Sequence, residues 1–151
     1  MRITFPESDE SGVVIDAFDR GSYIRVMHDR RTVVGYSTRN SGGVPENFKN
    51  WFIVRFDRKI RDFQIYDGEK PVGGEQLVGE HALVRVGFET RRGEQVTVRA
   101  ASSFISQMQA VQNLEELGKD DFETVKAKAQ ARWDEVLGRI EVEGGTTDQY
   151  R

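Results

Sequence analysis

The sequence predicts a mainly β fold, an antiparallel β-sandwich followed by two α-helices. Up to residue 104, apolar residues recur at every second position in short segments that turn-forming residues separate. Several links between these segments are too short for the crossover that parallel strands need, so neighbouring strands should be antiparallel. After Phe104 the apolar spacing becomes helical. We therefore expect a sandwich segment at residues 1–104 and a helical linker at 105–151.

The clearest predicted strand is residues 51–57. Phe52, Val54 and Phe56 share one face of it, and the residues between them share the other, which is typical of a strand with one packed side and one partly solvated side. Residues 82–88 alternate in the same way. The other predicted strands are 2–5, 12–18, 22–28, 31–39, 60–66 and 95–102.

The links favour hairpins. Residues 29–30 and 57–59 are short connections, and Gly93 stands where a hairpin loop requires a positive φ. Two longer glycine-rich segments, 40–47 and 67–79, are interpreted as plain connections.

Two helices should follow the strands. Ser106 and Gln109 fit a capping box that opens a helix at about 107–117, with Met108, Val111 and Leu114 on one stripe and Gly118 as its end. A second start signal at residues 120–123 opens a longer helix. Its apolar stripe should lie on the sandwich, where Trp133→Ala would cost about 3–5 kcal/mol. That stripe comprises Phe122, Val125, Ala129, Trp133, Val136 and Ile140.

The tail reads as a short extended run from Ile140 followed by a turn. Thr146 or Thr147 could cap a further helix opened by Asp148, so we expect a boundary inside a longer protein.

Composition limits the function classes. The 22 basic and 25 acidic residues give a net charge of -3, so we expect neither nucleic acid nor a membrane surface as a partner. Cysteine is absent, which excludes disulfides and thiolate chemistry but leaves the compartment open. No stretch approaches 18 apolar residues, and the first residues lack the apolar region of a signal peptide.

No local motif for catalysis or metal binding stands out. His28 and His81 have no evident sequence partner, and each is interpreted as structural or exposed. Trp51 is the one candidate carbohydrate-binding residue, because an indole can stack on a sugar ring; in an alternating strand a tryptophan more often packs inside the fold. We predict no catalytic residue and no metal ligand in this chain.

Three stretches in order resemble the N-terminal domain of glycoside hydrolase family 92. The first is Phe5-Pro6 followed by Val13-Val14-Ile15-Asp16. The second runs from Phe104-Ile105-Ser106 through Gln109-Ala110 to Asn113-Leu114-Glu115. The third and most specific comprises Trp133, Leu137, Ile140 and the run from Val142 to Thr146, with Asp148-Gln149. The matches between them are looser, and Val44 and Lys59 depart from the family pattern.

The resemblance implies a function for a larger parent protein. Members of this family are calcium-dependent, exo-acting α-mannosidases that invert the anomeric centre, with a supersandwich-like N-terminal domain and a helical-barrel catalytic domain. The chain would then be a non-catalytic scaffold whose partners are the downstream barrel of the same protein and a mannose-containing glycan. Calcium would belong to the parent enzyme and not to this fragment, and parents of this family are usually exported.

Two further expectations stay open. The alternative function is a free-standing carbohydrate-binding sandwich that uses Trp51 or residues 40–47. Exposed strand edges also predict self-association of the chain.

Overall fold

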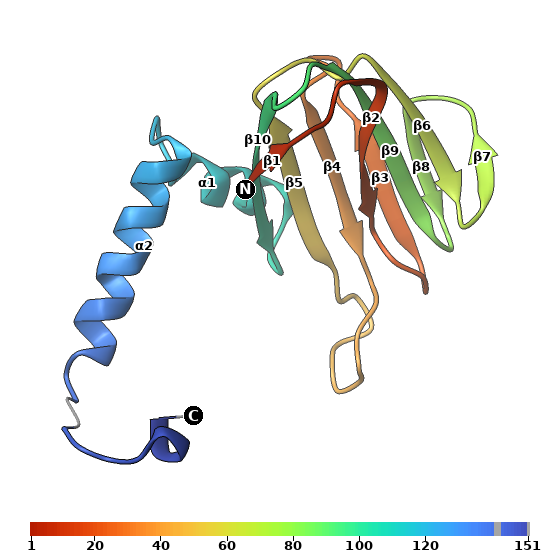
Figure 1. Cartoon of the computed structure of the whole chain (residues 1–151). Coiled ribbons are helices and arrows are strands. Elements are labelled where there is room, and N and C mark those ends of the chain that lie inside the picture. The colour runs from red at the N-terminus through yellow and green to blue at the C-terminus, as the bar shows by residue number, and fades with distance from the viewer. Residues whose placement is uncertain (141–142, 151) are drawn as a thin grey trace. The chain divides into compact units, whose positions relative to one another are not determined.

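A computed structural model gives the structure of the chain and describes residues 1–140 and 143–150. The chain divides into two compact units, Met1–Gly118 and Lys119–Arg151. The first unit contains all the described strands and the first helix (Figure 1). Each unit is described by itself below.

Two antiparallel sheets make up most of the first unit. One has the strand order β1-β10-β5-β4-β3-β8, and the other has the order β2-β9-β6-β7. Every strand pairing is antiparallel, so the predicted mainly β, antiparallel sandwich with two C-terminal helices is confirmed. The strands are β1 (Arg2–Thr4), β2 (Ser8–Asp16), β3 (Ser22–Val26), β4 (Thr32–Ser37), β5 (Asn50–Phe56), β6 (Asp62–Asp67), β7 (Lys70–Val72), β8 (Gln76–Gly79), β9 (Ala82–Thr90) and β10 (Gln95–Ser103).

The main core lies between the sheets. Alternate residues of β9 face it, and each is buried almost completely because the period of a strand sends every second side chain to the same face. Phe88 of β9 meets Phe56 of β5 with ring centroids 5.2 Å apart. The buried members of this core are Ile24, Val26, Val33, Phe56, Ile60, Ile65, Ala82, Val84, Val86, Phe88, Val96 and Val98.

A second, smaller core covers the outer face of the six-stranded sheet. Helix α1 (Gln107–Glu115) buries Ala110 and Leu114 there, together with Ile53 of β5. The expectation that this face of β5 is partly solvated is therefore wrong at Ile53, because the helix covers it. The first compact unit consequently extends past residue 104 to Gly118.

The capping of α1 agrees with the prediction better than the set of residues that the helix buries. The Ser106 hydroxyl accepts a hydrogen bond from the Gln109 N–H at 3.1 Å, and Gly118 has a φ of 53° just beyond the helix. The Gln109 side chain, however, donates to Asn113 instead of reaching back to Ser106. The predicted stripe is also wrong at Met108, which is exposed, since the helix turns Ala110 and Leu114 to the sheet.

Segment 67–79 is more ordered than predicted. It contains β7 and β8, two short strands at sheet edges, where the sequence indicated only a connection. Pro71 in β7 and Gly79 in β8 weaken the strand signal, since proline lacks an amide donor and glycine lacks a side chain.

In the second unit, helix α2 (Phe122–Leu137) begins after Asp121, whose carboxylate accepts from the Thr124 N–H. None of its residues is buried, and Trp133 is 64% exposed. Within its own unit α2 therefore leaves its apolar stripe uncovered, and the packing of that stripe on the sandwich, with the cost assigned to Trp133→Ala, stays a prediction. The short helix η1 (Thr147–Tyr150) forms where a further helix was predicted, while the extended run after Ile140 falls on residues 141–142, outside the described residues.

No helix within residues 1–140 and 143–150 is both long enough and apolar enough to cross a membrane.

Candidate functional site

Trp51 lies in a row of aromatic side chains on the outer face of the six-stranded sheet. The register pairs Tyr23 with Tyr36 and Tyr36 with Trp51 across β3, β4 and β5. The ring centroids of Tyr36 and Trp51 are 4.8 Å apart, with an edge-to-face angle of 69°. Trp51 also packs with the small core under α1. Trp51 is thus a half-buried structural neighbour of the helix.

A lysine lies against the rings of this row. The Lys49 ammonium lies 4.4 Å from the centre of the Tyr36 ring and 5.3 Å from that of Trp51. A cation over an aromatic face is attracted to the ring electrons, so Lys49 is held against this row. The carbohydrate-binding role of Trp51 stays a prediction, and its surroundings favour the structural interpretation.

Both histidines have carboxylate neighbours that the sequence did not reveal. Nε2 of His81 lies 2.8 Å from Oδ1 of Asp16, and Nδ1 of His28 lies 3.4 Å from Oε2 of Glu75. Asp16 is the last residue of β2 and Glu75 lies in the link before β8, both distant in sequence from their histidines, so no local motif could indicate them. Oδ1 of Asp16 also accepts from the Phe18 N–H at 2.7 Å, so this carboxylate organises the turn after β2.

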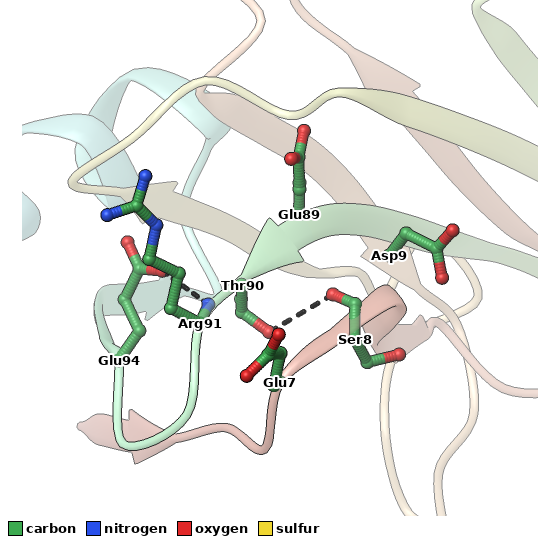
Figure 2. A pocket seen from close by; sticks show the side chains of 7 residues that line it. All are labelled: Glu7, Ser8, Asp9, Glu89, Thr90, Arg91 and Glu94. Carbon is green, nitrogen blue, oxygen red and sulfur yellow. Dashed lines mark hydrogen bonds between the residues drawn. The ribbon is translucent and has the colours of Figure 1, made fainter.

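An acidic hollow of about 700 Å³ lies where the β1–β2 link meets the β9–β10 hairpin. Its lining residues are Glu7, Ser8, Asp9, Glu89, Thr90, Arg91 and Glu94 (Figure 2). The side chains of Glu7, Asp9, Glu89 and Glu94 point in different directions in Figure 2 instead of converging. The Thr90 hydroxyl is already used, because it donates to the carbonyl oxygen of Pro6 at 2.8 Å.

Glu94 is a poor proton donor. A hydrogen bond from the Arg91 N–H, and a second from Arg58, lower the pKa of its carboxyl below the usual value. General acid catalysis of glycoside cleavage needs a carboxyl whose pKa is raised, so Glu94 does not suit that role.

Within the described residues, no three or more histidines, aspartates or glutamates lie together in a way that could hold a metal ion. Calcium prefers six to eight oxygen ligands. The acidic hollow therefore does not fit the ion that the family resemblance implies, and no step is assigned to calcium here.

A third feature, the loop-end hollow, lies at the end of the sandwich where β2 passes to β3 and β4 passes to β5. It has a volume of about 570 Å³, and its lining combines aromatic rings with an arginine and amides. Six of its lining residues are Phe18, Arg39, Asn40, Phe48, Asn50 and Phe104. Phe48 and Phe104 approach each other with ring centroids 5.5 Å apart.

The loop-end hollow was only partly predictable. Residues 40–47 were named as a possible sugar-binding loop, and Asn40 and three neighbours in that segment do line the hollow. Phe18, Phe48 and Phe104 were missed, because they come from separate links and two of them were assigned to secondary structure or its boundary. The sequence feature that could have indicated them is an aromatic residue next to a glycine-rich or polar turn that does not belong to an alternating or helical apolar pattern.

Comparison with known proteins places the chain in a family. The model of the glycosyl hydrolase family 92 N-terminal domain matches residues 1–103, and that of the family 92 catalytic domain matches residues 109–151. Among curated proteins, none matches the chain significantly.

Solved structures agree with these matches. The chain is similar to a family GH92 inverting mannosidase from Bacteroides thetaiotaomicron, with 35% identity and a TM-score of 0.89 over 96% of this chain. It is also similar to a GH92 alpha-mannosidase of the same organism solved in complex with mannoimidazole, with 28% identity and a TM-score of 0.85 over 95% of this chain. The chain spans 20% of the length of each relative. It therefore belongs to glycosyl hydrolase family 92, and residues 1–103 match the N-terminal domain of that family.

Proposed function

We propose that the chain is the non-catalytic scaffold of an exo-acting, calcium-dependent α-mannosidase. The observation that carries this proposal is the similarity to an inverting mannosidase across 96% of the chain, at 35% identity. In the proposed enzyme the first unit supports a following catalytic domain, and the substrate is a terminal α-mannoside of a glycan. By the same family resemblance, we propose that the parent protein is exported.

The chemistry of an inverting glycosidase is the reason why we assign catalysis to residues outside this chain. An inverting glycosidase needs a carboxylic acid at the leaving oxygen and a carboxylate that activates water, at about 6.5–9.5 Å from each other across a cleft. The acidic hollow has carboxylates, but their side chains spread apart, and the pKa of Glu94 is lowered. We therefore assign the acid and the base of the proposed reaction, and its calcium, to residues outside this chain.

The test is an activity assay of the purified chain on an aryl α-mannoside with added calcium. We expect no turnover above a buffer blank, while a family 92 mannosidase in the same buffer serves as the positive control. Robust turnover by the chain alone, abolished by Glu7→Gln or Glu89→Gln in the acidic hollow, would contradict the assignment of catalysis to another domain.

The alternative is a free-standing sugar-binding module centred on Trp51. Calorimetric titration with mannose and mannobiose separates the two: saturable binding that Trp51→Ala removes and Tyr23→Phe retains would favour the module. Because Trp51 packs with the small core under α1, we expect no effect of Trp51→Ala on sugar binding in a variant that stays folded.

A further inference from the structure

We propose that the loop-end hollow binds a neutral pyranoside, the mannoside of the glycan substrate. This inference rests on the proposed function for the identity of the sugar, and on the geometry of the hollow for the existence of the site. A sugar ring offers apolar C–H faces and hydroxyl groups that both donate and accept hydrogen bonds. A matching site needs exposed aromatic faces beside short polar side chains.

The aromatic part of the site is exposed. Phe104 is 70% exposed and Phe18 is 52% exposed, although phenylalanine is usually buried. They come from segments far apart in the sequence, one from the link after β2 and the other from the residue after β10, and both line the hollow. Rings brought together from distant segments and left uncovered are typical of a binding surface.

The backbone at Phe18 is held in a strained conformation. Phe18 has a φ of 65° and Arg20 a φ of 71°, in the left-handed region that side chains other than glycine seldom adopt. The Phe18 N–H donates to Asp16, and its carbonyl oxygen accepts from the Ser22 hydroxyl at 2.8 Å. These bonds fix the Phe18 ring at the hollow, and strain of this kind concentrates at functional sites.

The polar part of the site suits an uncharged ligand. The charge of Arg39 is balanced by an ion pair with Asp19, and its guanidinium lies 5.6 Å from the centre of the Phe18 ring. Asn40 and Ser37 supply an amide and a hydroxyl, and Asn50 carries a buried side-chain oxygen that has no hydrogen-bond partner. Because no bond restrains that oxygen, the Asn50 amide can turn toward a ligand without losing one.

The size of the hollow fits as well. At about 570 Å³ it lies within the range of about 300–1,000 Å³ that small-molecule sites occupy. The acidic hollow carries four carboxylates and suits a neutral sugar less well. Trp51 packs with the small core under α1, whereas Phe18 and Phe104 are exposed. The loop-end hollow is therefore the place where exposed rings and balanced polar groups coincide.

The test is a titration of the isotopically labelled chain with methyl α-mannoside, followed by amide chemical shifts. We expect saturable shifts at Gly42, Gly43 and Phe48 and none near Trp51. Phe104→Ala should weaken binding about 2- to 10-fold, the size of one aromatic contact, while Phe104→Tyr retains it. The matched control is Val78→Ala, because Val78 is 70% exposed and lies on edge strand β8, away from the hollow.

The outcomes separate the two proposals. Absence of shifts with the mannoside and with the matching glucoside and galactoside would overturn the site and leave the scaffold proposal standing. Binding of the galactoside but not of the mannoside would overturn the mannoside assignment of the hollow and leave the scaffold proposal to its own activity assay. Shifts that Phe104→Ala and Val78→Ala reduce equally, in variants whose spectra stay dispersed, would also overturn the site.

Discussion

Gly35 offers a sharp test of how closely β4 lies to its neighbours. A Cβ atom added there would lie 2.2 Å from the carbonyl oxygen of Tyr23 and 2.5 Å from Cζ of Phe52. The first contact is with backbone of the adjacent strand β3, which cannot rotate away. Gly35 has no positive φ, so Gly35→Ala tests this steric overlap and not backbone strain.

Two opposing effects set the magnitude. Alanine in place of glycine in a strand would stabilise the fold by about 0.5–1 kcal/mol if space allowed, because glycine loses more entropy on folding. Overlap in a filled core costs about 1–3 kcal/mol, and more where backbone must move. We therefore expect Gly35→Ala to lower the free energy of unfolding by at least about 1–2 kcal/mol, a large share of the about 5–15 kcal/mol of a typical domain.

Gly73→Ala is the matched control. Gly73 lies between β7 and β8, its φ is not positive, and an added Cβ would have no atom within 4 Å. We expect this variant to equal the original chain or to gain about 0.4–1 kcal/mol.

The assay is urea denaturation of the three proteins, followed by near-ultraviolet circular dichroism, which reports the aromatic side chains of the sandwich. The midpoint should fall in Gly35→Ala and stay or rise in Gly73→Ala, with similar slopes. Equal midpoints for the two variants would refute the claim that β3 and Phe52 leave no space for a Cβ atom at Gly35.

Three further predictions concern the helices, acid stability and assembly. Leu114→Ala should destabilise the first unit by about 2–5 kcal/mol in urea denaturation, because Leu114 is 3% exposed; an unchanged midpoint would contradict the assigned burial. Burial raises the pKa of Asp29, but hydrogen bonds from Arg31 and Thr32 outweigh it, so the pKa is lowered. The stability that the charged Asp29 contributes to the fold is present above the unfolded pKa of about 3.9 and is lost as pH falls through the folded pKa. Asp29→Asn should therefore make the free energy of unfolding depend less on pH below about pH 4. An unchanged pH dependence would contradict this. Light scattering should show self-association that weakens when Val14→Lys places charge on edge strand β2, and a strictly monomeric chain at high concentration would contradict it.

The strands were predictable because their signals are local. Phe52, Val54 and Phe56 alternate along β5, and the structure turns them to the core between the sheets. The hairpin at Gly93 was predictable for the same reason, since a φ of 78° at one position favours glycine.

What could not be predicted is which side chains are covered by segments that lie far away in the sequence. Ile53 was placed on a solvated face because nothing near it in the sequence indicates that α1 returns to cover it. The stripe that contains Trp133 has the helical spacing that was predicted, but spacing cannot show which surface covers the stripe, and α2 buries no residue within its own unit.

The candidate site was harder to predict than the fold. The segment 40–47 was visible as a glycine-rich loop, but Phe18 and Phe104 join it only after the sandwich closes. The ion pair of Arg39 with Asp19 likewise links two separate turns. Residues that come together only in the tertiary structure have no regular spacing in the sequence, so no motif could indicate this hollow.

The position of α1 bears on where the chain can be divided for expression. The family match to the N-terminal domain ends at residue 103, and the match to the catalytic domain begins at residue 109, so a cut between them looks natural. That cut would remove Ala110 and Leu114 from the sheet and leave Ile53 open to water. A fragment ending after Gly118 keeps this apolar surface covered and should be the more soluble of the two.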